Sequence, residues 1–199
     1  YIYFDESNRI SGDANDGIYQ FEASIPAYSE AGLWHVSQLE TRDSVGNSDF
    51  LTSADSSGDG DIPSHLLLSL NVLSDFSDTS APVFESLTLS QDTVDISSVE
   101  QTLTVTARIT DDLSGISHSS TNSGWAVVEM TSPSREQSVY IDFGEFNRIS
   151  GNANDGIYQA DLTIPAYSEP GNWSVGYIES SDNVGNIEFF SAPGFWGFG

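Results

Sequence analysis

The sequence predicts an all-β protein built of antiparallel β-sandwich repeats, and three observations support this fold class. Apolar and polar residues alternate along short stretches such as TLTVTARIT at residues 102–110, the pattern of a strand with one buried face. Such stretches recur roughly every ten residues, with Gly, Asn, Asp and Ser between them, as in a sandwich. No stretch combines a helical period with helix-capping residues.

The second half of the chain carries the clearer strand signals. Leu103, Val105, Ala107 and Ile109 fall on one face of the stretch quoted above. The strands expected in this half are residues 83–89, 102–110, 125–131, 138–143, 157–164, 173–180 and 187–191. In the first half, strands are expected at residues 1–4, 18–26 and 34–41, with a closing strand at residues 65–74.

A long internal repeat governs the organisation of the chain. NRISGDANDGIYQ at residues 8–20 returns as NRISGNANDGIYQ at residues 147–159. Residues 1–53 match residues 140–192 at 31 of 53 positions, so the spacing between the copies is constant. The first copy has no counterpart of the residues before Tyr140, which indicates a window cut from a tandem array.

This repeat divides the chain into two parts. We expect residues 1–75 to be the C-terminal part of one repeat and residues 76–82 to be a linker. Residues 83–199 would form a second repeat that lacks its last strand. An incomplete sandwich exposes strand edges, so strand addition by another chain and head-to-tail growth into a filament are further expectations.

Composition excludes several classes of function. The chain has five arginines, no lysine and 30 acidic residues, for a net charge of −25, which disfavours nucleic acids and anionic membranes. It has no cysteine, hence no disulfide and no thiolate metal site, and no apolar run long enough for membrane insertion. So many carboxylates repel one another unless cations bind among them, and bound calcium or a salty medium would supply these.

The expected topology gathers acidic loops at one end of the second sandwich. The loops after residues 110, 146 and 179 emerge at the end where the linker enters, and calcium prefers oxygen ligands of the kind they carry. The alternative is that these residues only form turns and solvated charge. The candidate ligands are Asp75, Asp78, Asp111, Asp112, Asp155, Asp182 and Asn183, with Asp16 and Asp43 as the first-copy counterparts of two of them. The acidic stretch DSSGDGD at residues 55–61 lacks the distal glutamate of a calcium loop and is expected to be a turn.

Five motifs together resemble the bacterial immunoglobulin-like, cadherin-like tandem repeats of secreted and cell-surface proteins. They are DTSAP (78–82), VTARITDDLSGI (105–116), SGNANDGIY (150–158), IPAYSEPGNW (164–173) and DNVGN (182–186). The resemblance implies immunoglobulin-like sandwiches in a secreted or cell-surface protein. It also implies a spacing or adhesive role, with calcium bound in some members.

The sequence thus predicts an extracellular structural or adhesive module, stiffened by calcium, whose partners are neighbouring repeats or copies of itself. The alternative is a carbohydrate-binding accessory module of a secreted hydrolase, with polysaccharide as partner and an exposed aromatic strip that includes Trp125. Catalysis is not expected, because the chain has no Gly-x-Ser-x-Gly, His-Glu-x-x-His or phosphate-loop motif. With so many acidic residues, composition does not exclude a catalytic carboxylate pair of the glycosidase type. A small sandwich, however, rarely provides the deep cleft that such a pair needs.

Overall fold

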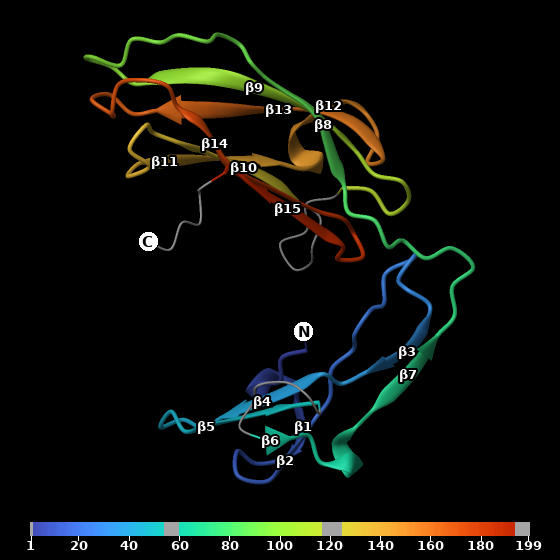
Figure 1. Ribbon diagram of the computed structural model, residues 1–199. Helices are drawn as coiled ribbons and strands as arrows, with labels where there is room; N and C mark the ends of the chain where they lie inside the picture. The colour runs from blue at the N-terminus through green and yellow to red at the C-terminus, as the bar shows by residue number, and fades with distance from the viewer. Residues whose placement is uncertain (1, 54–59, 117–124, 194–199) are drawn as a thin grey trace.

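The computed structural model describes residues 2–53, 60–116 and 125–193. Within these residues it contains β-strands and three short 3-10 helices but no α-helix, which confirms the all-β prediction (Figure 1). The tail at residues 194–199 and most of the acidic turn at residues 55–61 lie outside the described part of the chain.

Two four-stranded antiparallel sheets form a sandwich in the second half of the chain (Figure 1). One sheet has the strand order β11-β10-β14-β15, and the other has the order β12-β13-β9-β8. The strands are β8 (Val83–Leu89), β9 (Gln101–Thr110), β10 (Ala126–Thr131), β11 (Ser138–Phe143), β12 (Arg148–Gly151), β13 (Asp155–Ile164), β14 (Ser174–Ser181) and β15 (Ile187–Ser191). The 3-10 helix η3 (Glu145–Asn147) lies between β11 and β12.

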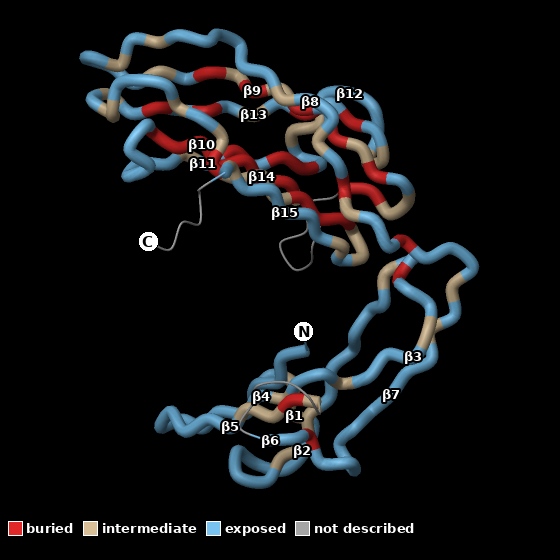
Figure 2. Tube along the Cα trace, in the orientation of Figure 1, coloured by how far each residue is buried: buried red, intermediate tan, exposed pale blue. Residues whose placement is uncertain are grey.

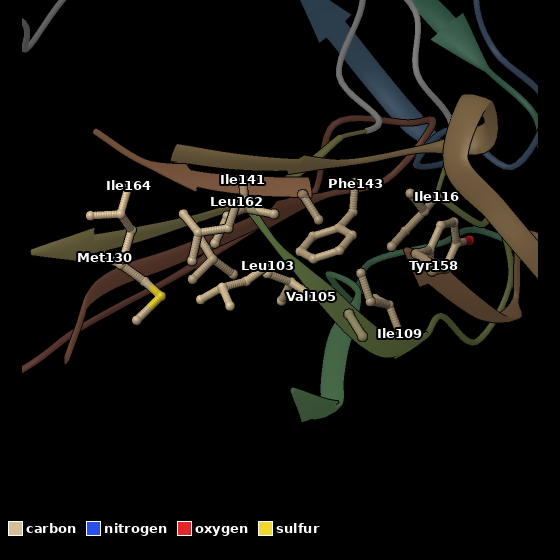
Figure 3. Close-up of a cluster of buried hydrophobic side chains, with 13 residues drawn as sticks. Leu103, Val105, Ile109, Ile116, Met130, Ile141, Phe143, Tyr158, Leu162 and Ile164 are labelled. Atoms are coloured by element: carbon tan, nitrogen blue, oxygen red, sulfur yellow. The ribbon is translucent and has the colours of Figure 1, made fainter. Parts of the chain in front are cut away.

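The core of this sandwich lies between the two sheets. Every second residue of β9, from Leu103 to Ile109, is buried, as the alternation in the sequence predicts. These side chains meet Ile141 and Phe143 of β11 from the facing sheet (Figure 3). Phe143 is fully buried and packs edge-on against Phe84, with ring centroids 6.0 Å apart.

The structure differs from the expected topology between residues 147 and 156. This segment was expected to be a loop, but residues 148–151 form β12, which pairs with β13 across a tight turn. The pairing extends the sheet beyond β13, on the side opposite β9. In the described part of the second copy, no further strand follows β15.

The first half of the chain forms three small sheets rather than a sandwich. Strand β1 pairs with β2, β3 with β7, and β5 lies between β4 and β6. Their bounds are β1 (Arg9–Gly12), β2 (Gly17–Tyr19), β3 (Gly32–His35), β4 (Gln38–Arg42), β5 (Ser48–Thr52), β6 (Gly60–Asp61) and β7 (Ser69–Val72), with 3-10 helices η1 (Glu6–Asn8) and η2 (Ser64–Leu66). Most described residues of this half are exposed (Figure 2).

Three strands expected in the first half are shorter than the sequence pattern predicts or do not form. Residues 2–4 form no strand, and of residues 18–26 only the beginning is paired, within β2. The expected closing strand at residues 65–74 is reduced to β7, which pairs with β3. Because a strand is held by hydrogen bonds to a neighbour, an alternating pattern without a neighbouring strand does not extend.

Candidate metal centre at the joint of the two repeats

The acidic residues of the linker and of the loop after β9 lie together where the two halves meet. One carboxylate oxygen each of Asp78, Asp111 and Asp112 lies within 4.8 Å of the other two. Asp78 belongs to the linker, while Asp111 and Asp112 follow β9 directly. We call these three residues the joint cluster.

Asp111 is the most informative member of the joint cluster, because one of its carboxylate oxygens has no partner. The backbone N–H groups of Leu113 and Gly115 donate to Oδ2 at 3.0 and 2.6 Å, which folds the loop back on itself. The other oxygen, Oδ1, is buried and has no hydrogen-bond partner, and the residue is only 8% exposed. A buried carboxylate oxygen without a partner is costly, so this atom is available to bind a cation or a proton.

Burial raises the pKa of Asp111 above its ordinary value. The N–H donors of Gly115 and Leu113 oppose this shift, whereas the nearby charges of Asp78 and Asp182 add to it. The charges of Asp78 and Asp182 therefore lie near enough to affect the protonation of Asp111.

Asp78 connects the two halves of the chain. Its backbone N–H donates to the carbonyl of Tyr28 in the first copy at 2.8 Å. Its carboxylate accepts from the backbone of Ser114 in the second copy at 2.6 Å and from the side chain of Asn186 at 3.4 Å. Asp78 is only 3% exposed, although it lies in a linker.

Asp182 and Asn183 support the joint cluster from the loop after β14. The carboxylate of Asp182 is fully buried and accepts from the backbone N–H groups of residues 184, 185 and 186. The side chain of Asn186 donates to Asp182 at 2.7 Å and to Asp78, so it links the loop to the linker. Asn183 donates to the carbonyls of Ser114 and Gly115, whose own backbone N–H groups donate to Asp78 and to Asp111 respectively. The two predicted residues therefore lie beside the cluster and organise its loops.

The remaining predicted ligands are not part of the joint cluster. Asp155 is held by Arg108 through two hydrogen bonds of 3.0 Å. This ion pair lowers the pKa of Asp155. Asp75 is exposed immediately before the linker. Asp43 is exposed and accepts from Asn47 within its own loop, which lowers its pKa.

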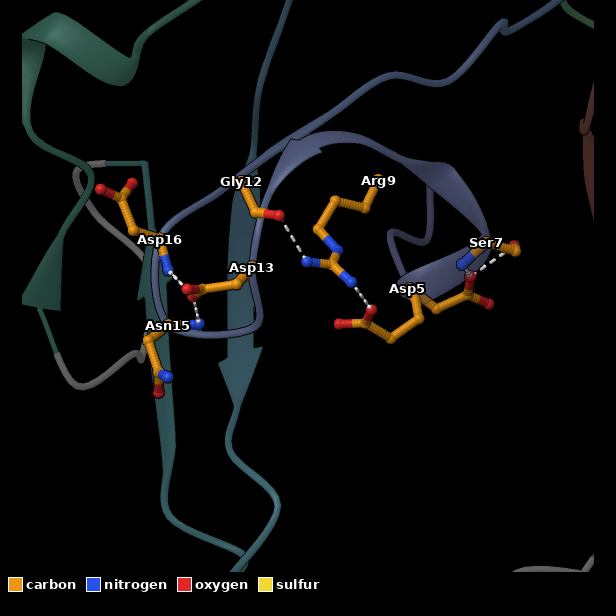
Figure 4. Close-up of polar contacts among 8 residues, drawn as sticks. Asp5, Ser7, Arg9, Gly12, Asp13, Asn15 and Asp16 are labelled. Carbon is orange, nitrogen blue, oxygen red and sulfur yellow. Dashed lines mark hydrogen bonds and ion pairs between the residues drawn. The ribbon is translucent and has the colours of Figure 1, made fainter.

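The repeated phrase that contains Asp16 and Asp155 forms a braced hairpin turn in both copies. In the first copy, the Asp13 carboxylate accepts from the backbone of Asn15 and Asp16 at 2.8 and 3.1 Å (Figure 4). Asn152 makes the same two contacts in the second copy. Gly12 and Gly151 have φ of +81° and +79°, and a Cβ there would lie 2.0 or 2.1 Å from a backbone carbonyl oxygen.

An arginine braces this turn from the strand side. Arg9 donates to the carbonyl of Gly12 and pairs with Glu6 at 2.6 Å (Figure 4). Arg148 repeats both contacts with Gly151 and Glu145 in the second copy. These contacts explain why the phrase occurs twice, because each copy needs the same hairpin.

The donor set of the joint cluster suits a hard cation. It consists of carboxylate oxygens with no imidazole or thiolate, which favours calcium over zinc. The three salt bridges among the described residues involve Arg9, Arg108 and Arg148, and none of them reaches the cluster. Three mutually repelling carboxylates without a salt bridge can together bind a divalent ion.

Sequence reasoning missed three polar residues of this site. Ser80 donates to Asp112 at 3.3 Å, and Asn186 links two loops as described above. The hydroxyl of Ser114 is buried without a partner, so it is a further potential oxygen ligand. Its position three residues after Asp111 in the same turn is the only signal that the sequence offered.

None of the helices in the described part of the chain has the length or apolar character needed to cross a bilayer. No curated protein and no solved structure matches the chain. A protein-family model, a domain of unknown function named DUF7035, matches residues 77–195, which is more than half of the chain and begins just before Asp78. The chain therefore belongs to the DUF7035 family.

Proposed function

We propose that this chain is a structural or adhesive module of an extracellular repeat array, stiffened by calcium where its two repeats join. The observation that carries the proposal is the buried, unpartnered Oδ1 of Asp111 beside the carboxylates of Asp78 and Asp112. The acidic composition and the internal repeat support it. The resemblance of the motifs within residues 78–186 to secreted immunoglobulin-like and cadherin-like repeats supports the extracellular location.

The mechanism is electrostatic. Without a cation, the carboxylates of the joint cluster repel one another and Asp111 lacks a partner for one oxygen. Calcium would bind that oxygen together with oxygens of Asp78 and Asp112, and the backbone contact of Asp78 with Tyr28 would carry this constraint to the first repeat. A bound ion stabilises the folded state by about 2.7 kcal/mol when its concentration is 100 times the Kd.

The test compares thermal unfolding of the chain in calcium and in EDTA. We expect a higher Tm and a narrower distribution of interdomain distances by small-angle scattering in calcium. Asp155→Asn is the matched control, because Asp155 lies at the same end of the sandwich but is paired with Arg108. It should keep the full calcium response. Equal melting of the native chain in both conditions would overturn the proposal.

A second candidate function, binding of a polysaccharide, is favoured by an aromatic strip on the outer face of one sheet. Tyr140, Tyr177 and Phe189 lie side by side, with centroids 6.4 Å apart for the two tyrosines and 5.2 Å for Tyr177 and Phe189. Tyr140 is 56% exposed and Phe189 is 40% exposed. Aromatic rings beside polar acceptors suit sugar rings, and Tyr140 donates to Glu129, one of whose oxygens is buried without a partner.

This second candidate has its own test. Glycan-array binding by the native chain should be lost in Tyr140→Ala and in Phe189→Ala, and retained in Phe146→Ala, whose ring is also exposed. Trp125, the residue that the sequence predicts in such a strip, is half-buried and lies immediately before β10. Absence of any glycan binding by the native chain would exclude this function.

A further inference from the structure

The aromatic strip of Tyr140, Tyr177 and Phe189 lies on a sheet face that also carries a buried carboxylate. Alternate residues of β10 point into the core, so Glu129 lies on the outer face of the sheet. Strand β10 lies between β11 and β14 (Figure 1). In the register of these strands, Tyr140 and Tyr177 lie directly opposite Glu129 on either side. The carboxylate side chain is therefore flanked by the two tyrosines of the strip.

Two further acids lie on the same face. Asp142 of β11 and Glu179 of β14 are both opposite Val127, two residues before Glu129. We call Glu129, Asp142 and Glu179 the face acids. The four strands of this sheet contain no arginine, the chain has no lysine, and none of the three salt bridges among the described residues involves a face acid. The face thus combines aromatic rings with negative charge that forms no ion pair in the described part of the chain.

Glu129 is the most informative of the face acids, because it is charged, buried and only half satisfied. It is 5% exposed, and its Oε1 accepts from the hydroxyl of Tyr140 at 3.1 Å. Its Oε2 is buried and has no hydrogen-bond partner, so it is available to a donor that reaches it. More than half of the surface of Tyr140 faces solvent, and rotation of that ring about χ1 would open a path to Oε2.

The face acids act on the strip without converging on one point. Burial raises the pKa of Tyr177, and Tyr140 and the face acids raise it further through their charge. The carboxylate oxygens of the face acids do not all lie within 4.8 Å of one another, as those of the joint cluster do. Negative charge spread along a row of residues suits a ligand with several positive charges along its length better than a single metal ion.

The strip suits sugar rings better than an extended peptide. Strands β10 and β14 are each paired on both sides, so neither offers an open edge for strand addition. A ligand must therefore be bound through side chains. The rings of Tyr177 and Phe189 are inclined to each other by only 31° and form nearly one surface, on which sugar rings can stack. A polysaccharide is the favoured occupant.

We propose that the polysaccharide bound at this face carries free, protonated amino groups. Its sugar rings lie along the aromatic strip, one ammonium group donates to Oε2 of Glu129, and neighbouring ammonium groups pair with Asp142 and Glu179. This ligand class rests on the polysaccharide-binding function proposed above and narrows it. It does not depend on calcium at the joint cluster.

The test measures binding of soluble glucosamine oligomers to the full chain by calorimetry, in a mildly acidic buffer at physiological salt. These conditions keep the amino groups protonated and the carboxylates charged, and the salt screens charges elsewhere on this acidic chain. The matched ligand is the same oligomer with every amino group acetylated, which keeps the sugar rings and removes the positive charge. We expect the amino form to bind roughly tenfold more tightly or better, because the acetylated form cannot make the charge-assisted hydrogen bonds.

Three variants locate the binding on the chain. Glu129→Gln should weaken binding of the amino oligomer roughly tenfold or more, since a neutral amide replaces the buried charge. Asp142→Asn should weaken it about threefold, as expected for one exposed ion pair. Asp161→Asn removes the same charge from an exposed position on the opposite sheet and should bind as the native chain does. Urea unfolding of each variant checks that the fold is kept.

The test separates the charge of the ligand from its class. Equal binding of the amino and acetylated oligomers, with loss in Tyr140→Ala, would keep polysaccharide binding and overturn the preference for amino groups. Binding of neither oligomer would overturn both. Equal affinities of Asp142→Asn and Asp161→Asn would reduce the effect to attraction by net charge and overturn the proposal. Preferential binding of polylysine at the strip would assign the face to a basic polypeptide and also contradict it.

Discussion

Substituting Asp111 by asparagine should stabilise the chain in EDTA and destabilise it relative to the native chain in calcium. The asparagine Oδ1 can keep the N–H donors of Leu113 and Gly115. Its amide nitrogen then replaces the unpartnered oxygen and can donate to a neighbouring carboxylate of the joint cluster. The change removes a buried charge that lacks a partner in the absence of metal.

The magnitude follows from these contacts. An unsatisfied buried polar group costs about 1–3 kcal/mol, and more when it is charged, so the variant should gain about that amount in EDTA. In calcium the variant loses the stabilisation that the bound ion gives to the native chain. That stabilisation is about 2.7 kcal/mol when the calcium concentration is 100 times the Kd. A change of 1 kcal/mol shifts Tm by roughly 2–4 °C in a protein of 150–250 residues, the size range of this chain. The effect therefore changes sign between the two conditions.

The assay is urea unfolding of the native and variant chains, followed by tryptophan fluorescence in calcium and in EDTA. The sign change distinguishes a metal ligand from a purely structural residue, which would lose stability in both conditions. Lower stability of Asp111→Asn in EDTA, or an unchanged calcium response, would refute the reasoning about the unpartnered oxygen.

Three further predictions concern pH, the repeated turn and the two cores. In EDTA, the free energy of unfolding of the native chain should rise relative to that of Asp111→Asn as pH falls through the raised pKa of Asp111, and the difference should level off below the ordinary value of 3.8, because the folded state binds this proton more tightly. A pH series of urea unfolding on both chains checks this, and a fall of the native chain relative to the variant over the same range would contradict it. Gly151→Ala should cost more than about 1 kcal/mol, since its φ is +79° and the added Cβ would lie 2.1 Å from a carbonyl oxygen, while Ser150→Ala in the same turn should change the Tm little. Phe143→Ala should cost about 3–5 kcal/mol in urea unfolding, whereas Phe4→Ala should stay within about 0.5 kcal/mol, and similar losses in both would mean that the first copy has a packed core.

The sequence predicts the strands well where their partners belong to the described chain. The alternation from Leu103 to Ile109 becomes β9, because strands on either side and a facing sheet bury that face. Residues 18–26 carry a similar pattern but remain largely unpaired beyond Tyr19. Periodicity is a local property, whereas strand formation depends on a partner distant in sequence, so the pattern alone could not predict this difference.

The candidate site was predictable in outline from the expected strand topology. Antiparallel topology brings the linker and the loop after β9 to one end, and the structure brings Asp78, Asp111 and Asp112 together there. Asp155 was grouped with them because its loop shares that end, but Arg108 on the adjacent strand holds its carboxylate. Which of two nearby partners a side chain chooses depends on rotamers and distances that residue order does not specify.

The position of Asp78 has a mechanical consequence. Its main chain is bonded to one repeat and its side chain to the next, so the crossover between repeats occurs within a single residue. Any bending or twisting of one repeat against the other must stretch contacts at this point, since no slack polypeptide lies between them. In an array of such repeats, the bending stiffness would then depend on a few oxygen atoms at each junction, while the folded repeats on either side stay unchanged.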